Sequence, residues 1–153
     1  MGLAISRDDG AKWKNGGVVG AFNWQIDACP HTGGALALTG KAEQRGVHYL
    51  ASQDGGANWS AKARLGGEYA QRADLTARGG ELAAVWDEVE GQSAAVFLSR
   101  SKDGGAAWSK PLRLSAEGAS AIYPRIVATQ ASLLVVWTES TGSDTKLRMV
   151  LMK

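Results

Sequence analysis

One polar, glycine-rich phrase occurs three times in this chain of 153 residues. It reads SRDDGAKW at 6–13, SQDGGANWS at 52–60 and SKDGGAAWS at 101–109. The first serines of the copies are 46 and 49 residues apart, and internal periods of this size are typical of a repeated supersecondary unit. Each copy fits Ser-x-Asp-x-Gly-x-x-Trp, and the matching residues are Ser6, Asp8, Gly10, Trp13, Ser52, Asp54, Gly56, Trp59, Ser101, Asp103, Gly105 and Trp108. The repeat predicts a fold built from similar units.

The phrase itself predicts a tight turn that closes a β-hairpin. Its Asp carboxylate can accept hydrogen bonds from the backbone N–H groups that follow, and its Gly adopts a positive φ without steric cost. Its Ser can bond across the turn, while its Trp returns the chain to a strand and packs against a neighbouring layer. Calcium is the alternative ligand-binding interpretation, because calcium sites use oxygen-rich loops. Each copy carries one or two carboxylates, which favours a structural role.

Short runs rich in Val, Leu and Trp lie between the turns, and none shows helical periodicity over three turns. The most regular unit predicts the strands YAQRADLTA (69–77), ELAAVWDE (81–88), SAAVFLSRS (93–101) and AWSKPLRL (107–114). Trp86 and Trp137 are 51 residues apart, so the run LLVVWTES at 133–140 continues the same period. Four antiparallel strands in each unit of about 50 residues are typical of a β-propeller blade.

The chain is expected to form a single partial propeller over residues 1–153. Its pieces are the end of one blade (1–20), a second blade (21–66), a third blade (67–115) and an incomplete last blade (116–153). Propellers close with about four to eight blades, so about three blades cannot form a ring alone. We therefore expect either a homodimer that completes the ring or a piece of a longer propeller.

Composition excludes several classes of function. The formal net charge is +2 and no basic cluster stands out, so nucleic acid is not expected as a partner. The longest apolar runs, such as LLVVW at 133–137, are far too short to span a membrane, so no membrane partner is expected either. The N-terminus has no recognisable export signal, and a single cysteine, Cys29, does not decide the redox compartment. The localisation of the protein stays open.

The three phrases resemble the Asp-box, or BNR repeat, of the sialidase-like β-propellers, and the resemblance covers essentially the whole chain. In that family the box forms the turn between the third and fourth strands of a blade. The Thr often found just before the Trp is replaced here by Lys12, Asn58 and Ala107. The resemblance implies an all-β fold of four-stranded blades, with two copies of the chain supplying a six-bladed ring. Related propellers are often periplasmic or secreted.

Ligands of propellers usually bind at the central channel, where the first strands of the blades and the loops before them converge. The residues expected there as ligand contacts are Trp24, His31, Tyr123 and Arg125. Cys29 and His31 also suggest a soft metal site, since thiolate and imidazole suit copper or zinc. A structural zinc site usually needs four ligands, so we expect no metal and no other cofactor.

The resemblance also raises the possibility of catalysis, because sialidases use three arginines, a Tyr–Glu pair and an acid–base Asp. The candidate members of such a set are Arg72, Arg125, Tyr69, Tyr123, Glu68 and Glu117. No sequence motif distinguishes these residues from solvated surface residues. The sequence therefore favours a non-catalytic module that binds a ligand, a glycan or a protein. The alternative is an exo-sialidase-type glycoside hydrolase or a fragment of one.

Overall fold

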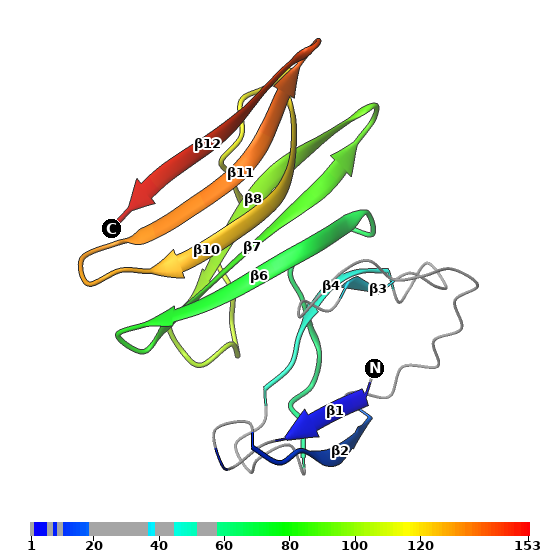
Figure 1. Ribbon diagram of the computed structural model, residues 1–153, viewed down its shortest axis with the longest axis vertical. Coiled ribbons are helices and arrows are strands. Elements are labelled where there is room, and N and C mark those ends of the chain that lie inside the picture. Colours follow the sequence, from blue (N-terminus) through cyan, green and yellow to red (C-terminus); the bar gives the residue numbers. More distant parts are fainter. Residues whose placement is uncertain (1, 6–7, 9–10, 19–36, 39–44, 52–57) are drawn as a thin grey trace.

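The computed structural model describes residues 2–5, 8, 11–18, 37–38, 45–51 and 58–153 (Figure 1). Within these ranges the chain forms β-strands in antiparallel sheets and no helix, which confirms the expected all-β class. The N-terminal sheets contain β1 (Gly2–Ile5) and β2 (Lys14–Val18), then β3 (Ala37–Leu38), β4 (Gly46–Tyr49) and β5 (Ala63–Arg64). The later sheets contain β6 (Ala70–Arg78), β7 (Glu81–Glu90), β8 (Ser93–Ser101) and β9 (Leu112–Arg113), then β10 (Ser120–Ala128), β11 (Leu133–Thr141) and β12 (Asp144–Met152).

The sheet of β6, β7, β8 and β9, called the central sheet below, follows the predicted unit closely. Its β8 has the predicted bounds of 93–101, and β7 contains the predicted strand at 81–88. The predicted fourth strand at 107–114 is much shorter in the structure, because β9 comprises Leu112–Arg113. Pro111 has no N–H group to donate, which favours a short edge strand at this point.

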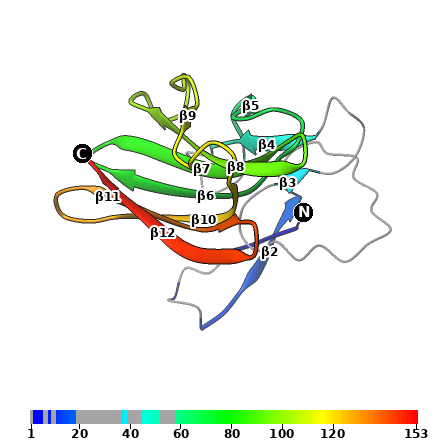
Figure 2. The same cartoon turned by 90° about the horizontal axis from the view of Figure 1, so that it is seen from above.

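Each face of the central sheet packs on another sheet. One face, with Val85, Val96 and Leu98, is buried against the sheet of β10, β11 and β12, called the outer sheet below. Figure 2 shows these two sheets as successive layers. The opposite face, with Trp86, is buried against residues of β4 such as Val47. The described core therefore consists of two apolar layers, one on each side of the central sheet.

The third copy of the phrase forms a hydrogen-bonded turn after β8. The Asp103 carboxylate accepts the Ala107 backbone N–H at 2.9 Å and the Ser101 hydroxyl at 2.7 Å. These two bonds, the Ala107 N–H first, hold the pKa of Asp103 below its ordinary value. The Gly105 N–H donates to the Ser101 Oγ at 2.8 Å, and Trp108 Nε1 donates to the Gly105 carbonyl at 3.1 Å. The phrase thus closes on itself through its own residues.

The other two copies of the phrase are described less completely. In the first copy the Asp8 carboxylate accepts the Lys12 N–H at 2.9 Å, the same bond that Asp103 makes with Ala107. Trp13, however, is 65% exposed, so its ring is not buried in the layer where we expected it to pack. In the second copy, Ser52, Asp54 and Gly56 lie outside the described residues.

The third turn is also held from outside by β4. The Tyr49 hydroxyl donates to the Gly104 carbonyl at 3.0 Å, and its ring meets the Trp108 ring edge-on at 5.1 Å between centroids. Gly105 has φ +93°, and a Cβ at this position would lie 2.1 Å from the Tyr49 ring. Position 105 therefore requires glycine for two reasons: the positive φ of the backbone, and the lack of space for a side chain beside Tyr49.

Candidate functional site

The first strands of the central and outer sheets carry the same backbone irregularity. The pairing register shifts between Gln71 and Asp74 in β6, and between Ile122 and Arg125 in β10. Within these bulges Arg72 has φ +47° and Tyr123 has φ +56°, a region that side-chain-bearing residues rarely adopt. The two residues are 51 positions apart and so occupy equivalent places in the repeat. Strained bulges of this kind re-aim side chains and cluster at functional sites.

Asp87 of β7 bonds to both bulges. Its Oδ1 accepts a hydrogen bond from Arg72 Nη1 at 2.8 Å, and its Oδ2 accepts the Tyr123 backbone N–H at 2.9 Å. The side chain of Asp87 is fully buried. One carboxylate therefore fixes a side chain of its own sheet and the backbone of the next sheet.

The electrostatics of Asp87 are set by two opposing effects. Burial disfavours the charged form and raises the pKa of Asp87 above its ordinary value. The Arg72 hydrogen bond, the Tyr123 N–H and the Arg72 charge act in the opposite direction without cancelling the effect of burial. Asp87 depends on its two donors, because a buried charge without partners is costly.

The Arg72 guanidinium lies over the exposed ring of Tyr123. The guanidinium carbon is 4.7 Å from the ring centroid, which is a cation–π distance. Tyr123 is 57% exposed, and the Arg72 side chain is 25% exposed. A planar cation and a phenol ring thus reach solvent together at one end of the two sheets. A guanidinium held in place this way suits a carboxylate or another planar anion.

Of the four residues expected as ligand contacts, Tyr123 and Arg125 are described. Tyr123 joins the cluster above, and Arg125 lies two residues further along β10 with an exposed side chain. Trp24 and His31 lie outside the described residues, as does Cys29. Among the described residues there is no group of three or more His, Cys, Asp or Glu that could hold a metal.

The hypothetical catalytic set is not brought together as a hydrogen-bonded unit within the described residues. There the side chains of Tyr69 and Tyr123 make no hydrogen bond to a carboxylate. Tyr69 is exposed, Glu117 is exposed and Glu68 is half-buried. The residue that sequence reasoning missed is Asp87, and the role of Arg72 as its partner was missed with it. The available signal was the spacing of 51 residues that aligns Arg72 with Tyr123.

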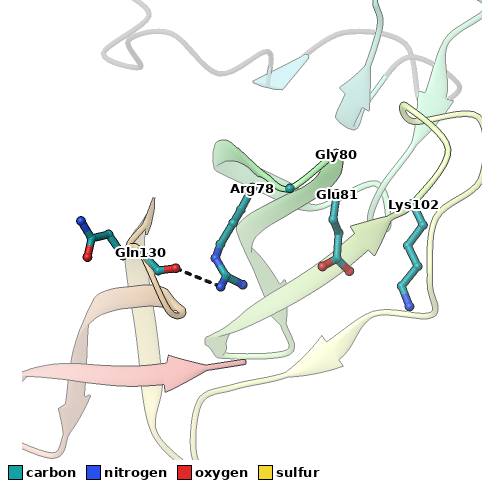
Figure 3. Close-up of a pocket in the computed structure, with 6 residues that line it drawn as sticks. Arg78, Gly80, Glu81, Lys102 and Gln130 are labelled. Atoms are coloured by element: carbon teal, nitrogen blue, oxygen red, sulfur yellow. Dashed lines mark hydrogen bonds between the residues drawn. The ribbon is translucent and has the colours of Figure 1, made fainter.

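A concave region lies near the opposite ends of the same strands, around the β6–β7 turn (Figure 3). This hollow has a volume of about 680 Å³ and is lined by Arg78, Gly79, Gly80, Glu81, Lys102 and Gln130. One nitrogen of Arg78 is engaged by the Gln130 carbonyl at 3.1 Å, and Glu81 offsets part of the positive charge. In this hollow only Gly79 and Gly80 have a positive φ, which glycine adopts without strain. The Arg72–Asp87–Tyr123 cluster is therefore the stronger candidate.

In the part of the chain that the structure describes, no helix is long and apolar enough to cross a membrane. Comparisons of the chain with protein-family models, with curated proteins and with solved structures found no match. Its function is therefore inferred from its own residues.

Proposed function

We propose that this chain is a non-catalytic binding module made of sialidase-like β-propeller blades. The central sheet supplies one such blade, and the outer sheet supplies the first three strands of the next. The repeated turn between β8 and β9 supports this proposal, because it occupies the position that the Asp-box has in that family. The spacing of 51 residues between equivalent strands supports it further.

The observation that carries the binding function is the Arg72–Asp87–Tyr123 cluster. Two equivalent first strands are strained at the same place, and the buried Asp87 holds both. The result is a pre-positioned guanidinium beside an exposed phenol, with the exposed Arg125 on the same strand as Tyr123. Pre-positioned donors lower the entropic cost of binding a ligand. The ligand class that this surface favours is a glycan or peptide bearing a carboxylate.

The contacts of Asp87 support a positioning role for this residue rather than acid–base chemistry. Both of its oxygens accept hydrogen bonds from the protein, and its side chain is fully buried. A general acid must reach the group that it protonates. Asp87 instead fixes the two groups that are exposed, Arg72 and Tyr123.

The test is binding of carboxylated glycans by the purified chain, screened on a glycan array and measured by calorimetry. Arg125→Gln is expected to weaken binding about 10-fold or more, since it removes an exposed charge without disturbing the Asp87 bonds. Arg78→Gln, which changes a half-buried arginine in the hollow around the β6–β7 turn, is the control and is expected to leave affinity unchanged. Equal loss in both variants would contradict the assignment of the site.

A fluorogenic sialoside separates binding from hydrolysis. The proposal expects no turnover by the wild-type chain above the background of the buffer. Turnover that Arg125→Gln abolishes would overturn the non-catalytic reading and favour the glycoside hydrolase alternative.

A further inference from the structure

The outer sheet presents an apolar face to solvent. In β12 the side chains of Leu147, Met149 and Leu151 are 69%, 66% and 67% exposed. These residues alternate with Val150 and Met152, which pack against the core shared with the central sheet. Because side chains alternate across a strand, the three exposed residues share the face that points away from that core.

The apolar side chains continue across the other strands of the outer sheet. Leu151 pairs with Leu134 of β11, which pairs with the exposed Val127 of β10. Met149 pairs with Val136 of β11, and Val136 pairs with the exposed Arg125 of β10, so the apolar surface is bordered by one arginine there. We call these six residues the outer face: Val127, Leu134, Val136, Leu147, Met149 and Leu151. A continuous apolar surface of this kind marks an interaction site on a soluble protein.

The molecule itself contains a covered version of the outer face. Leu147 and Met149 of β12 are each 51 residues after Val96 and Leu98 of β8. Val96 and Leu98 are 0% and 2% exposed, because the outer sheet packs on them. The same face of the repeat is therefore closed in one sheet and open in the next. What closes it in the central sheet is another sheet of this same chain.

The strand edges of the two sheets differ in the same way as their faces: the edge of β8 is covered and the edge of β12 is open within the described residues. β8 pairs with β7 on one side and with β9 on the other, through Phe97 with Arg113 and Leu98 with Leu112. Within the described residues, β12 pairs with β11 alone. An edge strand beside an apolar face is a ready template for a strand of another chain.

We infer that the outer face and the β12 edge are the docking surface for a second copy of this chain. The occupant is a second copy because the equivalent face of the central sheet is covered by a sheet of this chain. A second copy brings sheets of the same repeat, spacing and side-chain type. The inference goes beyond the ligand site, although the exposed Arg125 of that site pairs with Val136 of the outer face, so a second copy and a ligand are expected to compete.

The test is the mass of the purified chain in solution, measured by light scattering behind a sizing column at micromolar concentration. A dimer of twice 16.0 kDa is expected for the wild type. The double variant Leu147→Glu, Met149→Glu is expected to raise the dimer Kd by roughly 100-fold or more, because two charges would be buried in the contact.

Leu112→Glu is the matched control, since Leu112 is an exposed leucine on the short strand β9 and outside the outer face. It is expected to remain dimeric. Circular dichroism spectra of both variants are expected to match the wild type, because each changed side chain is exposed, whereas Tm is expected to fall only in the double variant, which loses the stabilisation by the partner. Hydrogen exchange is expected to protect the β12 amides in the wild-type dimer and to lose that protection in the double variant.

A wild-type chain that is monomeric at micromolar concentration overturns the inference. So does a folded double variant that dimerises as tightly as the wild type, because the contact would then lie elsewhere. If the double variant does not fold, the single change Leu151→Lys at the same face provides the same comparison. Carboxylate binding in the monomeric variant measures the ligand site separately from the docking surface.

Discussion

The central and outer sheets have the same three leading strands, but they differ where their surroundings differ. In each sheet a Trp Nε1 donates at 3.2 Å to the Glu two residues later, Glu88 in one and Glu139 in the other. The residue that pairs with this Trp on the next strand differs between the two sheets. Phe97 stacks on Trp86 in the central sheet, whereas Arg148 bonds to Glu139 at 2.9 Å in the outer sheet.

A second difference concerns the residue between the Trp and the Glu. It is the buried Asp87 in the central sheet and the half-buried Thr138 in the outer sheet. Asp87 contacts the bulge of the following sheet, and Thr138 makes no such bond among the described residues. The comparison teaches that the Trp–Glu bond belongs to the repeat. The neighbouring positions depend on what each sheet packs against.

The largest expected effect on stability comes from replacing Asp87, the residue that differs between the two sheets. Asp87→Ala removes the acceptor of both Arg72 and the Tyr123 N–H, and is expected to lower the free energy of unfolding by about 3–5 kcal/mol. Thr138→Ala, at the equivalent position, is expected to cost less than about 1 kcal/mol. Urea unfolding followed by fluorescence measures both. Similar losses in the two variants would contradict the role assigned to Asp87.

Glycines at equivalent positions sharpen the comparison. A Cβ on Gly67 would lie 2.1 Å from Glu88 Oε1 and displace the carboxylate that accepts the Gly67 N–H at 3.1 Å. Gly67→Ala is therefore expected to cost about 1–3 kcal/mol. Gly118, 51 residues later, has φ +78° and no atom within 4 Å of an added Cβ, so Gly118→Ala is expected to cost about 1 kcal/mol.

The double variant Gly67→Ala, Glu88→Ala provides the control for this mechanism. If the clash with Glu88 is the cause, the two changes are expected to cost less together than the sum of the single variants. Additive losses measured by urea unfolding would point to another cause.

The pH dependence of stability tests the ion pair that distinguishes the outer sheet. Burial opposes ionisation of Glu139, but Arg148, the Trp137 Nε1–H and the Ala116 N–H hold its pKa below the ordinary value. A carboxyl with a lower pKa in the folded state stabilises the fold above its unfolded pKa. That stabilisation is lost as the pH falls through the folded pKa.

The expected result is a Tm of the wild type that falls below about pH 4. In Glu139→Gln the fall is expected to be smaller by about 2–4 °C, because one titrating group is gone. Thermal melts from pH 6 to pH 3 measure it. An unchanged slope in this variant would show that other carboxyls account for the acid sensitivity.

The smallest expected effect on stability is at an exposed ion pair on β12, the strand that also carries Arg148. Lys146 Nζ lies 2.6 Å from Asp144 Oδ2, with both side chains more than half exposed. Lys146→Ala is expected to change the free energy of unfolding by less than about 0.5 kcal/mol, because exposed pairs are screened by water. A loss comparable to that of Asp87→Ala would mean that the exposure of an ion pair does not determine how much it contributes to stability.

The strands were predictable because their signals are local. The apolar run in SAAVFLSRS and the turn phrase after it predicted β8 at its observed bounds, 93–101. The strand predicted at 107–114 is shortened to Leu112–Arg113, because Pro111 and the length of the turn act against pairing. Local periodicity does not report how many residues of an edge strand bond to their neighbour.

The candidate site contains residues of both kinds, expected and unexpected from the sequence. Tyr123 and Arg125 were expected as ligand contacts because a first strand was predicted to begin there, and both lie in β10. Asp87 was not, since it sits in an apolar run and its partner Tyr123 is 36 residues away. The sign of φ at Arg72 and Tyr123 was equally hidden, because neither residue is one that usually adopts this conformation. Trp24 and His31 remain predictions outside the described residues.

The bond from Tyr123 to Asp87 also has a consequence for the order of folding during synthesis. The acceptor is made 36 residues before its donor, so for an interval after the central sheet is synthesised water takes the place of the Tyr123 N–H at one oxygen of Asp87. At about 5–20 residues per second this interval lasts roughly 2–7 seconds. The central sheet thus makes its last bond to Asp87 only when the first strand of the outer sheet has been translated.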